Sequence, residues 1–147
     1  MNKAFVREPD IDGSAYCPRC GAAGVSVSAT AMDKHIRGDC RSRMGERAAF
    51  CGTPSCNVAY FNWFGACVTV DELNGPVYPK HPDAPLCACF GFTLSEIEAD
   101  VRDGTPTRIR ALLAKSQSPD ARCASLAADG RCCMPEVQRR YMRLRAQ

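Results

Sequence analysis

Cysteine content constrains the fold of this chain more than any other feature of its sequence. Eleven of the 147 residues are cysteine, close to the level found in small proteins built around disulfides or metal ions. The number is odd, so the cysteines cannot all pair within one chain. The N-terminal segment has no apolar stretch typical of secretory signals. We therefore expect a cytoplasmic protein in which the thiols bind metal rather than form disulfides.

Hydropathy and charge exclude two classes of function. No run approaches the roughly 18 apolar residues that a membrane helix requires, so no membrane association is expected. The formal net charge is +3. It would fall to about −1 if the chain bound one zinc ion and one oxidised 2Fe–2S cluster, each through four thiolates, since each such site carries about −2. Basic residues of the first cysteine-rich segment do not cluster among aromatic ones, so no nucleic-acid partner is expected.

Changes in composition divide the chain into four segments. Residues 1–15 are polar and aperiodic, and we expect a flexible N-terminus. Residues 16–74 hold six cysteines and short strand-like runs, whereas residues 86–147 hold the other five and have helical periodicity. Between them, residues 75–85 carry four prolines at three-residue spacing, which favours a semi-rigid linker over a ligand for a proline-binding module. The predicted fold class is α+β, a small β module followed by a helical domain.

Two short cysteine turns predict a zinc ribbon in residues 16–74. One turn is YCPRCG, with Cys17 and Cys20, and the other is FCGTPSC, with Cys51 and Cys56. Such turns direct both sulfurs at one ion, and two of them form a tetrahedral site of four sulfurs. Strand-like runs, including residues 25–30, flank both turns. A module of this size lacks a large apolar core, so bound zinc should supply much of its folding free energy.

Other assignments for this module remain open. A redox C-x-x-C is one, although a strand-like run rather than a helix follows Gly21. A rubredoxin-like iron site is another, although four residues rather than two separate the cysteines of the second turn. Cys40 or His35 could replace one of the four ligands. Otherwise we expect His35 and His81 at the surface and Cys67 in a buried strand.

Residues 86–147 predict three helices with cysteines near their N-termini. Cys87 and Cys89 precede a helix over 94–103, which a T-x-x-E capping box begins and a glycine ends. Thr105 should cap the next helix, with Pro106 at its first position. The third helix should start near residue 134 and present one apolar face.

Three further cysteines precede this last helix. Cys132 and Cys133 are adjacent at its start, and Cys123 lies in the loop before it. Helix N-termini present unpaired N–H groups, which suit an anionic iron–sulfur cluster. The pattern therefore predicts a cluster held by the C-x-C pair, Cys123 and one of the two adjacent cysteines, with the choice between them left open.

The helical half resembles the BFD-like 2Fe–2S family in the segment CACFGFTLSEIEADVRDGTPTRIRALL, followed by C…CCMPEV. Members of that family have a C-x-C, a helical hairpin and a final cysteine followed by x-Pro-Glu. The resemblance implies that Cys133, which stands before MPEV, is the fourth ligand and that Cys132 is its neighbour. The last pair of ligands is more widely spaced here than is usual for the family.

A ribbon followed by such a domain resembles the N-terminal region of CopZ-type copper chaperones, over about residues 16–142. The chain contains no M-x-C-x-x-C loop, so we expect it to lack the heavy-metal-binding domain of larger members. The resemblance implies zinc on Cys17, Cys20, Cys51 and Cys56, and a 2Fe–2S cluster on Cys87, Cys89, Cys123 and Cys133.

A four-thiolate 2Fe–2S cluster exchanges one electron and needs no open coordination position, so we expect a redox carrier rather than an enzyme. Within the family resemblance, the reaction to expect is metal-ion reduction, from Cu(II) to Cu(I), in copper homeostasis. Soft thiolates favour Cu(I), and Cys132 is the candidate transient ligand. The expected partner is a redox protein or a copper-handling protein, which the arginines of the last helix could dock. The alternative function is an iron–sulfur sensor or assembly adaptor without redox turnover.

Overall fold

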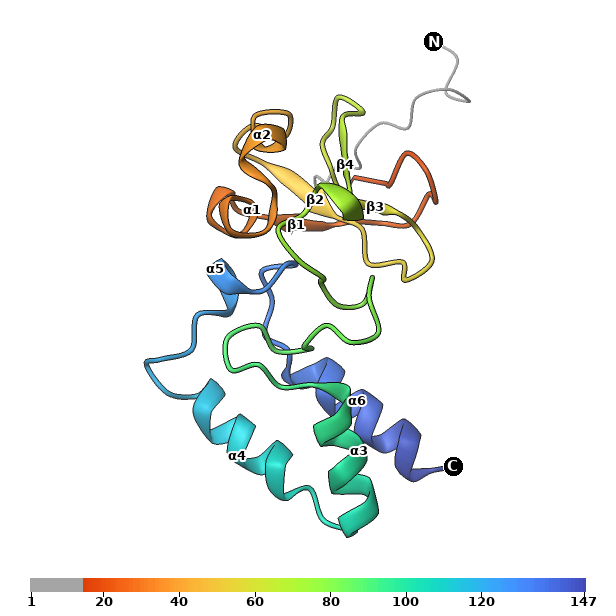
Figure 1. The fold of residues 1–147 in the computed structure, drawn as a ribbon, viewed down its shortest axis with the longest axis vertical. Coiled ribbons are helices and arrows are strands. Elements are labelled where there is room, and N and C mark those ends of the chain that lie inside the picture. Colours follow the sequence, from red (N-terminus) through yellow and green to blue (C-terminus); the bar gives the residue numbers. More distant parts are fainter. Residues whose placement is uncertain (1–14) are drawn as a thin grey trace.

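A four-stranded antiparallel sheet in the order β1-β2-β3-β4 forms the first lobe of the computed structural model (Figure 1). Its strands are β1 (Val25–Val27), β2 (Ala48–Phe50), β3 (Val58–Phe61) and β4 (Cys67–Thr69). The structure describes residues 15–147, so the predicted flexible N-terminus, residues 1–15, lies outside it apart from Ala15. No helix of the described part is both long and apolar enough to cross a membrane.

The two central strands are covered on both faces. Every residue of β2 and β3 is buried, which explains why their sequences are continuously apolar rather than alternating. Phe50 pairs with Tyr60 across the two strands, and their rings meet edge to face with centroids 5.4 Å apart. One face of the sheet packs against the helical segment that follows β1. The opposite face packs against the two turns that carry Cys17, Cys51 and Cys56.

The strand predicted over residues 25–30 is shorter than expected. β1 ends at Val27, and α1 (Ala29–His35) begins directly after Ser28. A second short helix, α2 (Gly38–Arg41), follows, and η1 (Val70–Glu72) is a single 3-10 turn. Four buried side chains at four-residue spacing hold α1, α2 and the following turn against the sheet: Met32, Ile36, Cys40 and Met44. The segment that joins β1 to β2 therefore contributes these four side chains to the core of the sheet lobe.

Three helices form the second lobe: α3 (Leu94–Asp103), α4 (Thr107–Ser116) and α6 (Met134–Arg145). The predicted bounds of α3 agree with the structure, as do its capping box of Thr93 and Glu96 and its end at Gly104. The apolar face of α6 is also as predicted, since Met134, Val137 and Tyr141 are buried.

The N-terminus of α4 differs from the prediction. Pro106, rather than Thr105, is the cap residue, and no side chain of the cap itself bonds to the helix. Asp100 of α3 takes that role, because its carboxylate accepts the backbone N–H groups of Arg108 at 3.2 Å and of Ile109 at 2.9 Å. Asp100 is fully buried and also pairs with the Arg108 side chain at 3.1 Å. The two helices are thus locked together at their turn.

The segment between α4 and α6 packs on the first lobe. Its short helix α5 (Cys123–Leu126) lies against α1 (Figure 1). Tyr60 donates its hydroxyl to the carbonyl of Ala128 at 2.6 Å, and His35 Nε2 bonds to the carbonyl of Leu126 at 2.6 Å. His35 was expected at the surface, but it is half-buried in this contact, and burial lowers its pKa. His81 is exposed, as predicted.

Candidate metal centres

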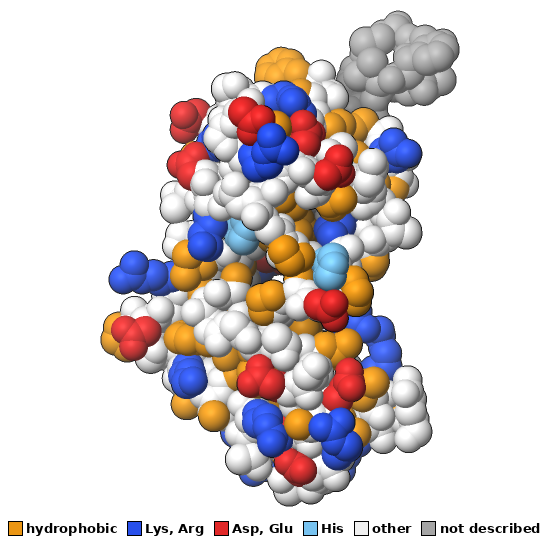
Figure 2. Space-filling view, viewed as in Figure 1, with side chains coloured by type: hydrophobic (Ala, Val, Ile, Leu, Met, Phe, Trp, Pro, Cys, Tyr) orange, Lys and Arg blue, Asp and Glu red, His pale blue; other side chains and the backbone are white. Residues whose placement is uncertain are grey.

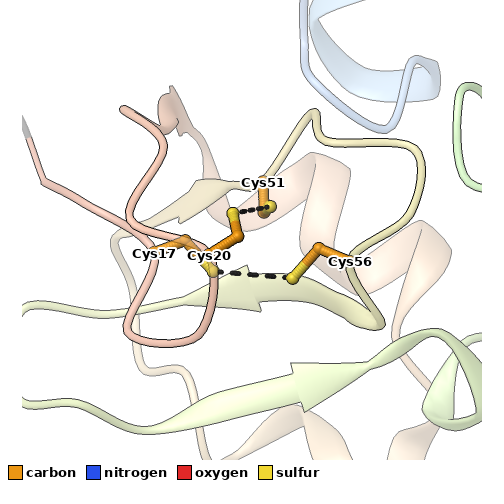
Figure 3. A group of neighbouring side chains, drawn as sticks. All are labelled: Cys17, Cys20, Cys51 and Cys56. Atoms are coloured by element: carbon orange, nitrogen blue, oxygen red, sulfur yellow. Dashed lines mark hydrogen bonds between the residues drawn. The ribbon is translucent and has the colours of Figure 1, made fainter.

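Four cysteines predicted as zinc ligands, named here the first cysteine group, converge at one edge of the sheet: Cys17, Cys20, Cys51 and Cys56. All four sulfur atoms lie within 4.8 Å of one another (Figure 3). Cys17 Sγ is 3.9 Å from Cys56 Sγ, and Cys20 Sγ is 3.6 Å from Cys51 Sγ. Sulfurs held tetrahedrally about 2.3 Å from a zinc ion lie about 3.8 Å apart. The group therefore fits zinc in both ligand chemistry and spacing.

The first turn is built by local backbone bonds. The N–H of Cys17 bonds to the carbonyl of Ala22 at 2.8 Å, and the N–H of Gly21 bonds to the carbonyl of Cys17 at 2.9 Å. Gly21 has a φ of 77°, a conformation that glycine adopts without steric cost. This geometry bends the chain so that both sulfurs of the C-x-x-C face the same point.

The second turn is closed by a residue from the proline-rich segment. Lys80 Nζ donates to Cys51 Sγ at 3.4 Å and to the carbonyls of Thr53 at 2.7 Å and Cys56 at 3.0 Å. A zinc ion bound by four thiolates carries a formal charge of about −2, so the ammonium lies where it offsets that charge. Sequence reasoning missed this residue, because nothing near Lys80 in the chain indicates its contact with the turn.

Protonation of the first cysteine group also indicates a cation site. Burial raises the pKa of Cys17 to about 12. Burial opposes ionisation of Cys20 as well, but hydrogen bonds from the Thr53 side chain and the Ala22 backbone outweigh it and lower its pKa to about 6. The group thus holds thiol and thiolate side by side, and a bound metal ion would replace the remaining protons.

Residues considered as alternative ligands lie elsewhere. Among the described residues, neither Cys40, Cys67 nor His35 belongs to the four-thiol group. Cys40 is buried and donates to Glu72 at 3.3 Å. Cys67 begins β4 and is partly buried, with its thiol bonded to the Gly65 carbonyl at 3.6 Å.

The remaining predicted ligands, named here the second cysteine group, form two close pairs rather than one tetrahedron: Cys87, Cys89, Cys123 and Cys133. Cys89 Sγ is 3.7 Å from Cys123 Sγ, and Cys87 and Cys133 are buried in the same core cluster, where each shifts the pKa of the other. Within residues 15–147, the first cysteine group alone brings three or more ligand atoms within 4.8 Å of one another. The second group therefore does not converge on a single ion.

Three structural elements deliver the second cysteine group. Cys87 pairs with Phe92 through two backbone bonds of 3.2 Å, and Gly91, with a φ of 68°, allows this tight turn. Cys123 begins α5, and Cys133 is the residue that caps α6. The Cys133 side chain makes no capping hydrogen bond, and Pro135 occupies one of the first positions of α6.

Three cysteines of the second cysteine group also have shifted pKa values. Interaction with the Cys133 thiol is the largest cause that lowers the pKa of Cys87, to about 6, and the same interaction raises the pKa of Cys133. Burial, followed by the bond with Cys89, raises the pKa of Cys123 to about 12. A bound cation would favour ionisation of the thiols whose pKa is raised in this way.

Cys132 lies outside the two pairs. It is exposed, whereas its neighbour Cys133 is buried, and both line a cavity of 450 Å³ at the junction of the lobes. Cavity walls come from the sheet lobe as well, including Val25 and Phe50, and apolar side chains are visible at this waist (Figure 2). The larger cavity, of 620 Å³, is lined by residues 42–47 and 62–64 and by no cysteine.

Substitution of Lys80 tests whether this residue supports zinc binding by the first cysteine group. We expect Lys80→Met to weaken zinc binding by about 10-fold to 100-fold, the usual effect of losing a residue that supports metal ligands. Zinc release to a chromogenic chelator would measure this change. Lys34→Met removes one exposed ammonium from α1 and should release zinc at the wild-type rate. Equal rates for all three proteins would show that Lys80 does not support the site.

Comparison with known proteins agrees with the fold. Residues 14–74 match the zf_CopZ family, described as a zinc binding domain. The X-ray structure of the Archaeoglobus fulgidus CopZ N-terminal domain superposes with a TM-score of 0.73 at 23% identity, covering 85% of this chain and 96% of that chain. No curated protein matches the sequence significantly. A CopZ-type zinc-binding ribbon over residues 14–74 and a mixed α/β fold are thereby confirmed. The individual ligands and a role in metal handling remain predictions.

Proposed function

We propose that this protein is a zinc-containing electron-transfer and metal-handling protein whose second cysteine group holds a 2Fe–2S cluster. The observation that carries the proposal is the 3.7 Å contact of Cys89 Sγ with Cys123 Sγ beside Cys87 and Cys133, which are buried together in the core cluster that Cys89 packs against. Two thiolates for each of two tetrahedral irons is the ligand arrangement of such a cluster, whereas a mononuclear site needs four sulfurs around one point. The division into a ribbon, a linker at 75–85 and a cluster domain belongs to the same proposal.

The protein's own residues would hold and protect this centre. When bound, the cluster supplies one-electron exchange and no open coordination position. Cys87 and Cys133 are 2% and 8% exposed, so this pair would exclude water from the inner side. The positive end of the α6 dipole, at whose N-cap Cys133 stands, would favour the anionic centre.

Copper is the substrate that the soft ligands favour. One electron from the reduced centre would convert one Cu(II) to Cu(I), returning the centre to its oxidised state. Cys132 would then bind Cu(I) through its thiolate after losing its proton, because it is exposed and adjacent to the centre. The partners would be a cytoplasmic electron donor and a copper-handling protein that accepts the ion.

Metal analysis of anaerobically purified protein tests the proposal. We expect a red-brown protein with about two irons, two sulfides and one zinc per chain. After stoichiometric reduction with dithionite, addition of Cu(II) with a Cu(I)-specific chelator should form the Cu(I) complex as the absorption of the oxidised centre returns. Colourless protein with two zinc ions per chain would reject the redox function.

A sensor or assembly adaptor is the alternative that the same experiment separates. That function predicts the same iron content but no transfer of the electron to Cu(II) within minutes. An intact cluster without copper reduction would therefore favour the adaptor, whereas loss of iron from a folded protein would reject both.

A further inference from the structure

The second cysteine group has one closed side and one open side. Cys87 and Cys133 are buried, whereas Cys89 and Cys123 are partly exposed and Cys132 is exposed. Electron transfer between proteins requires close approach to the exposed side of a centre. A partner would therefore reach this site past Cys89, Cys123 and Cys132.

Three exposed cations neighbour the cysteines of this open side. Lys115 Nζ lies 5.9 Å from the ring centroid of Phe90, the residue that follows Cys89. Arg122 and Arg131 directly precede Cys123 and Cys132 in the chain, and all three basic side chains are exposed. These residues are named here the basic rim. Each of the three accessible cysteines thus has one rim residue next to it in the chain or next to its neighbour in space.

The basic rim is free of internal ion pairs. Within residues 15–147, no salt bridge involves Lys115, Arg122 or Arg131, whereas Arg139 and Arg140 of α6 both pair with Glu136. Ion pairing within the chain therefore does not account for the position of the rim. Its charges remain available to a partner.

Charge is unevenly distributed between the two parts of the chain. Residues 105–147 contain nine basic and three acidic residues, whereas residues 15–104 contain eight basic and ten acidic ones. The whole helical lobe, residues 86–147, contains ten basic and seven acidic residues, and both kinds are visible on it in Figure 2. Near the rim the carboxylates are Asp120, which is exposed, and Asp129, which accepts the backbone N–H of Arg131 at 3.0 Å. Asp129 and Glu136 line the same cavity as Arg131 and Cys132, and Glu136 is neutralised by its ion pairs with Arg139 and Arg140.

We propose that the basic rim is the docking surface for an acidic redox protein that exchanges electrons with the cluster of the second cysteine group. The inference rests on the proposed function and adds the site and chemistry of its partner. Complementary charge around an exposed redox centre speeds encounter and orients the partner with its own centre toward the exposed edge. The rim residues neighbour the three exposed or partly exposed cysteines. The last turn of α6, with Arg143 and Arg145, lies roughly 15 Å along the helix from Cys133.

Small oxidants of opposite charge test the docking surface on the intact protein. Dithionite-reduced protein is mixed with one equivalent of hexacyanoferrate(III), an anion, or of tris(phenanthroline)cobalt(III), a cation, and each accepts one electron. We expect Lys115→Glu/Arg122→Glu to slow oxidation by the anion about 10-fold or more at low salt, and to speed oxidation by the cation, because steering reverses with charge. The difference should fade at about 0.5 M salt, where screening is strong.

A matched control keeps the change in net charge but moves it away from the centre. Arg143→Glu/Arg145→Glu should change both rates less than the rim variant does at low salt, and should leave them within about two-fold of wild type at about 0.1 M salt, where the roughly 15 Å from Cys133 exceeds the Debye length of about 10 Å. As a readout without electron transfer, hexacyanochromate(III), a redox-inert paramagnetic trianion, should broaden the NMR signals of Lys115 and Arg122. It should leave Arg143 and Arg145 sharper.

Each outcome decides a different question. Equal rates for wild type and the rim variant, with the visible absorption of the cluster intact, would reject the docking surface and leave the proposed function standing. Absence of iron from the wild-type protein would reject the proposed function itself. Retention on duplex DNA at about 0.15 M salt, lost in the rim variant, would overturn the assignment to a redox protein.

Discussion

Cys133→Ala should yield a colourless protein that keeps its zinc but has lost its iron. Cys133 is buried at the N-cap position of α6, in the same core cluster as Cys87, so its removal would leave one iron with an incomplete ligand set. Loss of one of four thiolates should abolish the visible absorption almost completely, because the cluster requires all four ligands. Iron and sulfide analysis and the absorption spectrum of anaerobically purified protein would measure this.

Cys132→Ala is the matched control, since it removes an identical thiol one residue away. Cys132 is exposed and belongs to neither sulfur pair, so this variant should keep the wild-type iron content and colour. The rate at which it passes Cu(I) to a chelator should change, because the proposed transient ligand is missing. If Cys132→Ala lost the cluster and Cys133→Ala kept it, the assignment of the fourth ligand would be wrong.

Removal of zinc should unfold the sheet lobe. Zinc binding contributes about 10–16 kcal/mol of apparent free energy in small structural sites, more than the net stability of most domains of this size. Cys51 is fully buried, and its N–H bonds to the carbonyl of Ala59 at 2.8 Å, so Cys51→Ala would remove a ligand at the centre of the lobe. Far-ultraviolet circular dichroism and thermal unfolding should show loss of the strand signal and of the cooperative transition.

The control for this loss is another cysteine of the same lobe. Cys67 lies in β4 outside the four-thiol group, so Cys67→Ala should keep one zinc per chain. It should cost at most about 1–2 kcal/mol, the usual effect of a partly buried truncation. Retention of stoichiometric zinc and of the sheet by Cys51→Ala would contradict the ligand set.

Features encoded by neighbouring residues could be predicted from the sequence. The capping box of Thr93 and Glu96 and the final Gly104 define α3 within about a dozen residues, and both ends are where the sequence indicated. The cysteine turns are local as well, since glycine and hydrogen bonds within a few residues shape them. The ligand set of the second cysteine group came from the helix starts together with the family resemblance, and it stays a prediction.

Features that depend on contacts distant in sequence could not. The cap of α4 comes from Asp100, eight and nine residues before the N–H groups that it accepts, so the local signal of Thr105 was misleading. His35 has polar neighbours in the chain, and its contact with Leu126 lies 91 residues away. Lys80 reaches the zinc turn from a segment whose prolines indicated a linker. Each of these residues is polar and satisfied by a remote partner, which sequence periodicity does not report.

The contact of α5 with the sheet lobe bears on how such a protein could be re-engineered. The carbonyls of Leu126 and Ala128 lie between Cys123 and Cys133, and both are bonded to side chains of the other lobe, His35 and Tyr60. A helical lobe grafted onto a foreign carrier would leave this loop without its anchors. Such a graft would therefore need hydrogen-bond donors on the new carrier that replace His35 and Tyr60. Otherwise it would need a shorter loop that positions Cys123 and Cys133 without them.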